Sequence, residues 1–279
     1  MSSNTAKHAA PPGVSIRVEG IGKRYVLGKA RNDSSVRDGF NDLLNLPLNL
    51  LKGQQNAQAE RPDDFWALRD VTFDLREGEV LGIVGSNGSG KSTLLKILSR
   101  ITRPTAGHFE IFGRLGSLLE IGTGFHPDLT GRENVYLNGS FLGMKRHEIE
   151  AQFDRIVEFS GVEKFIDTQV KYFSSGMYVR LAFSVAAHLG SDILLLDEVL
   201  AVGDIGFQHK SREKTRSIAK DGRSIIFVSH IMPTVLELCD RVMWLNKGKM
   251  MCIGDTESVL KTYMDSEAIS LSSLDQPVP

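Results

Sequence analysis

The sequence has little cysteine, no excess of one charge and no long apolar run. Its two cysteines, Cys239 and Cys252, have neither the spacing of metal ligands nor that of a disulfide framework, which favours a reducing compartment. Lys and Arg total 33 against 34 Asp and Glu, so the net charge of −1 creates no long-range field for nucleic acid or anionic lipid. No run approaches the roughly 18 apolar residues that span a bilayer, and the N-terminus lacks the apolar core of a signal peptide. We therefore expect no nucleic-acid partner, and a membrane role only through another protein.

The organisation predicted from composition is one domain with flexible ends. Apolar residues make up 41% of the chain, enough for a substantial core. Residues 1–13 and 264–279 are weak in core-forming periodicity, so we expect flexible ends and a single domain over 14–263. Residues 26–64 have polar ends and an apolar middle, which predicts an insertion with a short amphipathic helix. A tolerated surface loop is the alternative interpretation of that segment.

Hydrophobic periodicity predicts a doubly wound α/β core. Apolar residues alternate over 14–18 and 71–75, as in strands that open a sheet. Residues 192–197 and 224–230 contain short continuous apolar runs, which are typical of parallel strands buried on both faces. Between the strands, residues 147–161 carry apolar side chains at helical spacing, and Gly161 is placed to stop the helix. Strands that alternate with helices indicate a parallel sheet covered by helices.

A phosphate-binding loop follows one predicted strand. Residues 85–92 read GSNGSGKS, which matches G-x-x-x-x-G-K-[ST], and residues 91–100 then predict a helix. The glycines let backbone N–H groups and the helix N-terminus face phosphate oxygens, while Lys91 places a charge on the β- and γ-phosphates and Ser92 ligates Mg²⁺. The predicted nucleotide-binding residues of this loop are Gly85, Ser86, Asn87, Gly88, Ser89, Gly90, Lys91, Ser92 and Thr93.

Polar side chains follow two further buried strands. Asp197 and Glu198 come at the end of the run ILLLDE, where Asp197 is suited to hold magnesium and Glu198 to activate the attacking water. His230 ends the run SIIFVSH, and we expect it at the same sheet edge, in contact with the γ-phosphate. A lone histidine is more often structural, and the shared edge is what favours a catalytic role here.

A third motif separates this chain from other phosphate-loop ATPases. Residues 173–177 read FSSGM before a predicted helix, which resembles the ABC signature motif, usually LSGGQ. Ser174, Ser175 and Gly176 combine a helix N-cap with a close-approach glycine, and thus form a second anion-binding helix start. Because one chain carries only one phosphate loop, the motif predicts a head-to-tail dimer in which each signature contacts the ATP of its partner.

With these motifs in order, residues 14–263 resemble the ABC ATPase family. That resemblance implies a RecA-like P-loop core with an antiparallel β subdomain, a helical subdomain at about 119–190, and ATP with Mg²⁺ as cofactors. It also implies that Tyr25 stacks on adenine and that residues 199–204, VLAVGD, touch the partner protomer.

Longer stretches, among them LLEIGTGFHPDLTGRENVYLNG and LLLDEVLAVGDIGFQHK, look like the ATPases of bacterial polysaccharide exporters. This resemblance implies a separate transmembrane permease, a lipid-linked cargo such as O-antigen, capsule or teichoic acid, and a peripheral position on the cytoplasmic side of the inner membrane. In that group the segment equivalent to 26–64 lies toward the membrane subunit.

Two features depart from the family pattern, and both also occur in the exporter group. The usual glutamine between sheet and helical subdomain is missing, with Glu120 or Ile121 near its place, so the coupling of γ-phosphate to partner movement is in question. The signature ends in Met177. The chain stops shortly after Tyr263, which leaves no room for the sugar-binding β-sandwich of some exporter ATPases.

Three other functions compete with polysaccharide export. An ABC transporter for another cargo would carry the same motifs. A soluble ABC ATPase acting on ribosomes or DNA predicts paired cassettes, a long coiled coil or a basic face, none of which the sequence has. An ATP-binding scaffold without turnover predicts loss of Lys91 or Glu198, and both are present.

Overall fold

A computed structural model describes residues 12–26, 64–119, 124–197 and 203–274, with side chains up to residue 267. The chain divides into two compact units, Met1–Lys23 with Ala67–Pro279, and Arg24–Trp66. Within the smaller unit, the Arg24 guanidinium pairs with Asp64 at 3.0 Å and lies 5.8 Å from the ring centroid of Trp66. Most of the predicted insertion 26–64 is outside the described residues.

Two sheets form the framework, a six-stranded one in the order β5-β6-β7-β3-β8-β9 and a three-stranded one in the order β2-β1-β4. In the larger sheet, pairing is parallel from β5 through β8, and β9 is antiparallel to β8. In the smaller sheet, β1 and β4 are antiparallel. The predicted parallel core and antiparallel subdomain are both present. The strands are β1 Val14–Val26, β2 Asp64–Arg76, β3 Val80–Val84, β4 Ala106–Ile111, β5 Leu115–Ser117, β6 Ile193–Asp197, β7 Ser224–Val228, β8 Arg241–Asn246 and β9 Lys249–Asp255.

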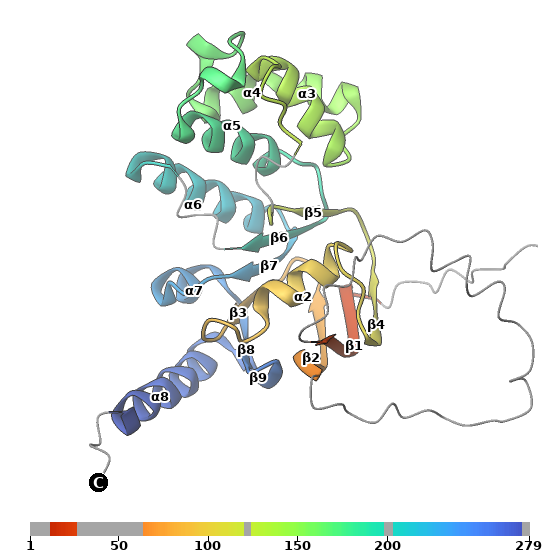
Figure 1. Cartoon of the computed structure of the whole chain (residues 1–279), viewed down its shortest axis with the longest axis vertical. Coiled ribbons are helices and arrows are strands. Elements are labelled where there is room, and N and C mark those ends of the chain that lie inside the picture. Colours follow the sequence, from red (N-terminus) through yellow and green to blue (C-terminus); the bar gives the residue numbers. More distant parts are fainter. Residues whose placement is uncertain (1–11, 27–63, 120–123, 198–202, 275–279) are drawn as a thin grey trace, which may run out of the picture. The chain divides into compact units, whose positions relative to one another are not determined.

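The six-stranded sheet is buried on both faces, as its continuous apolar strands predict. Successive side chains of a strand point to opposite faces. Leu81 and Ile83 of β3 accordingly join a cluster with apolar residues of β1, β2 and α2, whereas Val80 and Val84 join a cluster with residues of α4 to α8. Figure 1 shows α2 on one side of the sheet and α6 and α7 on the other. This is the doubly wound arrangement expected from the sequence.

The helices begin and end at recognisable capping residues. Thr130 and Glu133 form a reciprocal capping box at the start of α3, and Gly161, with φ of 67°, ends α4 at the predicted position. Short 3₁₀ turns at Glu163–Phe165 and Val170–Tyr172 lead from α4 to α5. The helices are α2 Lys91–Leu98, α3 Gly131–Phe141, α4 Arg146–Ser160, α5 Ser175–Ala187, α6 Ile205–Lys220, α7 Met232–Leu238 and α8 Thr256–Leu274.

Helices α3, α4 and α5 form a layer of their own at one end of the larger unit (Figure 1). Its core contains Val135 of α3, Ile149 and Ile156 of α4 and Leu181 of α5, all fully buried. The stacked rings of Tyr136 and Phe153 join α3 to α4, with centroids 5.7 Å apart. These helices lie within residues 119–190, where the sequence predicts helical structure.

The expectation of a flexible end from residue 264 is wrong for residues 264–274, because α8 continues to Leu274. Tyr263 anchors the helix through an edge contact with Trp244, with ring centroids 5.8 Å apart. Residues 264–274 contain neither glycine nor proline, so no residue stops the helix there. None of the helices in the described part of the chain combines the length and apolar character needed to cross a membrane.

Candidate functional site

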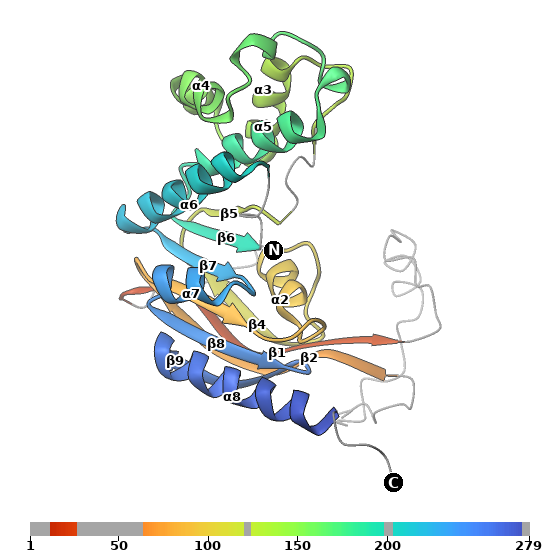
Figure 2. The ribbon, with the colours of Figure 1, turned by 90° about the vertical axis from the view of Figure 1, so that its left-hand side faces the viewer.

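The carboxyl ends of three neighbouring strands meet at one edge of the large sheet. In the parallel register, Ile83 of β3 lies beside Val228 of β7, and Asp197 of β6 lies on the other side of Val228. The residues that follow these positions therefore leave the sheet at the same edge. The phosphate loop leaves from β3, Asp197 closes β6, and the exposed His230 follows β7, so the predicted shared edge is confirmed. Figure 2 shows β6 and β7 pointing the same way, toward the side where α2 begins.

Glycines of the phosphate loop are required by backbone conformation and by close approach. Gly85 has φ of 148°, and a Cβ atom there would lie 2.1 Å from the Leu245 carbonyl oxygen and 2.7 Å from Ser89 Oγ. Gly90 has φ of 108°, and a Cβ there would lie 2.7 Å from the Ala67 carbonyl oxygen. Gly88 has φ of 79° but no neighbour within 4 Å of such an atom. The loop is thus tightly held at both ends and open at Gly88.

The start of α2 is suited to an anion. Lys91 folds over the loop, because its Nζ donates to the carbonyl oxygens of Gly85 at 2.6 Å and Ser86 at 2.9 Å. The N-cap residue Gly90 offers no side-chain cap, and no acidic residue lies in the first turn. The helix dipole and the N–H groups of its first turn therefore favour negative charge. Among the other predicted residues, Ser86, Asn87, Gly88 and Ser92 are exposed, Thr93 is half-buried and Ser89 is buried.

A hairpin that the sequence analysis did not single out supports this loop. Lys247 and Gly248 have φ of 46° and 78°, as in the two-residue turn that joins β8 to β9. The Gly248 N–H donates to the Ser89 carbonyl oxygen at 2.9 Å, and the Gly248 carbonyl oxygen accepts from the Arg69 N–H at 2.8 Å. The turn residues Asn246-Lys247-Gly248 were the available signal, since glycine in such a run predicts a tight hairpin. Their contact with the loop is a long-range feature that no local pattern encodes.

The signature segment opens α5 as predicted. Ser174 has extended backbone angles, and its Oγ accepts a hydrogen bond from the Met177 N–H at 3.2 Å. Ser174 and Ser175 are exposed and Gly176 is half-buried, whereas residues 181–187 are all buried. The helix therefore presents its N-terminal hydroxyls at the surface while its other end is anchored in the core. No acidic residue lies in its first turn, so this N-terminus also favours an anion.

Several predicted residues are not placed with the site. Glu198, and the predicted dimer contacts up to residue 202, fall outside the described residues, as do Glu120 and Ile121. Tyr25 belongs to the smaller unit, so its stacking on adenine stays a prediction. Asp204, at the end of the VLAVGD segment, caps α6 by accepting from the Phe207 N–H at 2.9 Å.

Comparison with known proteins identifies a family and several relatives. A family model described as ABC transporter matches residues 68–201. The O-antigen export system ATP-binding protein RfbB of Klebsiella pneumoniae is 42% identical over 236 residues, which cover 84% of this chain and 92% of that protein. The teichoic acids export ATP-binding protein TagH of Enterococcus faecalis is 47% identical over 199 residues, 71% of this chain and 44% of its own length.

Solved structures are similar in fold at low sequence identity. The dimeric ATP-binding cassette MJ0796, in a post-hydrolysis state with ADP and Pi, superposes with a TM-score of 0.64 at 20% identity, over 86% of this chain and 98% of that one. The structure of an ATP-binding subunit of an ABC transporter gives a TM-score of 0.68 at 19% identity, over 92% and 99% of the two chains. With its fold, its phosphate loop and its relatives in agreement, the chain belongs to the ABC transporter family, as one of its ATP-binding proteins.

Proposed function

We propose that this chain is the ATP-hydrolysing subunit of an ABC transporter that exports a lipid-linked polysaccharide through a separate transmembrane subunit. The observation that carries the ATPase part is the shared edge of β3, β7 and β6. It brings the Lys91 loop, Asp197 and the segment of His230 to adjoining strand ends. The export part is supported by the relatives, which are named as O-antigen and teichoic acid export ATP-binding proteins.

In the proposed site, the phosphate loop and the start of α2 bind the ATP phosphates. Lys91 supplies a positive charge, and the backbone N–H groups supply hydrogen bonds. The exposed hydroxyl of Ser92 and the carboxylate of Asp197 fit a magnesium ion, because hard oxygen ligands are what Mg²⁺ takes in nucleotide sites. When bound, the ion neutralises phosphate charge.

Glu198 directly follows Asp197 and is the proposed base that orients the attacking water. His230 contacts the γ-phosphate from the end of β7. Asp197, which precedes Glu198 in the sequence, and Val228, two residues before His230, lie side by side in β6 and β7. Phosphoryl transfer depends on positioning and charge stabilisation, which this set of groups supplies.

The signature residues Ser174, Ser175 and Gly176 are proposed to contact ATP bound to a second copy of the chain. Their helix N-terminus is exposed, favours an anion and belongs to a different layer from the phosphate loop. A head-to-tail dimer would thus close around two ATP molecules. Opening and closing of that dimer on the cytoplasmic face of the membrane would drive the transmembrane subunit.

Substitution of Glu198 tests the ATPase and the dimer together. Glu198→Gln should retain ATP binding and lose turnover, because the amide cannot activate water while the phosphate contacts survive. We expect light scattering to show twice the monomer mass with ATP and the monomer mass without it. Glu163→Gln, at an exposed site on another element, is the matched control. Rapid turnover in Glu198→Gln would remove this residue from its role.

The cargo is tested by purifying the tagged chain from its native membrane and identifying what accompanies it. A polytopic membrane subunit with a lipid-linked glycan is the expected result. A permease for solute uptake would contradict export and leave the ATPase chemistry intact. A ribosome or DNA complex would exclude transport.

A further inference from the structure

A cavity of about 430 Å³ lies between α4, the end of α5 and α6, at the amino end of the large sheet, away from the phosphate loop. Three cationic side chains line it from separate elements: Arg155 of α4, Lys214 of α6, and Arg223, which directly precedes β7. A groove of about 470 Å³ shares Arg155 and Lys214 and adds Lys210 together with two carboxylates, those of Glu158 and Glu213. Positive charge from α4, from α6 and from the residue that precedes β7 therefore meets at one cavity.

These cations are only partly balanced by neighbouring acids. In the described part of the chain, no carboxylate lies within ion-pair distance of Arg155 or Lys214, and Arg223 donates to the Leu189 carbonyl oxygen at 2.8 Å. Arg155 is exposed, but Lys214 and Arg223 are half-buried, and Arg and Lys side chains at such positions usually have a carboxylate partner. The unbalanced charge calls for another explanation.

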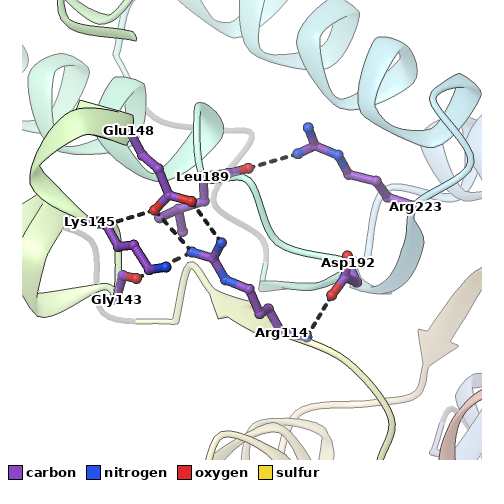
Figure 3. Close-up of polar contacts among 7 residues, drawn as sticks. All are labelled: Arg114, Gly143, Lys145, Glu148, Leu189, Asp192 and Arg223. Carbon is purple, nitrogen blue, oxygen red and sulfur yellow. Dashed lines mark hydrogen bonds and ion pairs between the residues drawn. The ribbon is translucent and has the colours of Figure 1, made fainter. Parts of the chain in front are cut away.

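Glu148, one of the two carboxylates that line the cavity, is already bound to a fourth cation. Glu148 pairs with Arg114 at 2.9 Å and also accepts from the Lys145 N–H at 2.7 Å. Asp192, which is outside the lining, accepts from the backbone N–H of Arg114 at 2.7 Å. Figure 3 shows Glu148 turned toward Arg114, while Arg223 extends toward the Leu189 carbonyl. Asp221 is the remaining carboxylate of the lining, so the cations are in excess.

Holding these positive charges close together in a partly buried cavity is electrostatically unfavourable. Burial, followed by repulsion from Arg223, lowers the pKa of Lys214, and Asp221 opposes the shift only in part. Burial also lowers the pKa of His188 to about 4, and Lys214, Arg155 and Arg223 each add to that lowering. His188 is therefore neutral at pH 7, and the positive field of the cavity comes from the three long side chains.

We propose that this cavity binds the phosphate group of a small soluble molecule, at a second anion site distinct from the ATP site. Arginine guanidinium groups match phosphate oxygens in pairs, and a lysine adds a point charge. Gln152 of the lining offers an amide donor beside them. A bound phosphate would join α4 of the helical layer to α6 and to the start of β7 in the core.

Pyrophosphate is the probe for the test, used on full-length protein that carries Lys91→Ala to remove binding at the phosphate loop. Isothermal titration should show one pyrophosphate per chain. Adding Lys214→Gln or Arg155→Gln should weaken binding about tenfold or more, the loss expected for one charged contact. Arg146→Gln, which lies on α4 and pairs instead with Glu150, is the matched control and should change affinity less than twofold.

A second measurement needs no substitution in the cavity. Pyrophosphate should slow acetylation of Lys214 in the Lys91→Ala protein about tenfold, as read by mass spectrometry, and leave the exposed Lys220 of the same helix unaffected. Absence of pyrophosphate binding to the Lys91→Ala protein would overturn the proposal. Pyrophosphate binding that is unchanged by substitution of Arg155 and Lys214 would also overturn it. So would equal acetylation of Lys214 and Lys220 in the presence of pyrophosphate.

Discussion

The Nζ of Lys91 lies 2.6 Å from the carbonyl oxygen of Gly85, so the side chain at the start of α2 spans the phosphate loop back to its first glycine. The loop itself therefore holds the ammonium group of Lys91 in place. A phosphate bound there would meet an ammonium group already held over the loop, with little side-chain ordering left to complete.

Lys91→Ala should abolish ATP turnover, because it removes the charge that faces the β- and γ-phosphates. We expect a loss of roughly 100-fold or more in kcat, the scale seen when one preorganised group that stabilises the transition state is removed. Lys96→Gln, exposed on the same helix, should turn over normally. A phosphate-release assay gives the comparison, and near-normal turnover in Lys91→Ala would contradict the proposed site.

Two glycines of the loop should differ in their tolerance of alanine. Gly85→Ala places a methyl group against the Leu245 carbonyl at a positive φ, so we expect a loss of more than about 3 kcal/mol in the free energy of unfolding. Gly88→Ala meets no neighbour and carries only the backbone cost of roughly 1 kcal/mol. Urea unfolding of both variants measures the difference. Equal losses would mean that the close approach at Gly85 is relieved by movement of the hairpin.

Substitutions at Ser174 can separate helix capping from nucleotide contact. Ser174→Ala should lower the free energy of unfolding by about 1 kcal/mol through loss of the cap to Met177. Ser174→Asp keeps a good cap, so its stability should stay within about 0.5 kcal/mol of the parent. Its ATPase activity should nevertheless collapse, because the added negative charge would oppose the phosphate of the partner's ATP. Normal turnover in Ser174→Asp would leave the segment as a helix cap alone.

His188 should make the fold sensitive to mild acid. Its pKa is about 4 in the folded chain and 6.5 without burial, so between these values the unfolded chain binds more protons. Stability should therefore fall as the pH drops from 6.5 to 4, by roughly 2 to 3 kcal/mol at most. His188→Gln should reduce this dependence, and His147→Gln, exposed on α4, should not. Urea unfolding midpoints at pH 7 and pH 4.5 measure this dependence. An equal fall in stability between the two pH values in all three proteins would contradict the role of His188.

The parts of the fold that local pattern encodes were predictable. Short apolar runs gave β6 and β7, and Gly161 marked the end of α4, since burial on both faces and a left-handed cap leave direct traces in sequence. The same holds for the phosphate loop and for Ser174, whose roles as turn and cap depend on neighbours a few residues away.

Features that depend on distant segments were not predictable. The contact of Gly248 with Ser89 and the meeting of Arg155, Lys214 and Arg223 join elements far apart in the chain, and no spacing rule connects them. The error at residues 264–274 has another origin. Serine-rich sequence has weak helix propensity, but a helix already anchored by Tyr263 continues until a residue stops it.

The position of β7 between β3 and β6 also bears on how the protein is made. Although β7 is the last of the three strands to leave the ribosome, it separates the other two in the sheet, so β3 and β6 have no partner in common before it arrives. A nascent chain that ends before Ser224 contains the phosphate loop and Asp197 but cannot align their strands. The nucleotide site therefore depends on late, long-range pairing, and we expect a nascent chain to be unable to hydrolyse ATP before β7 has left the ribosome.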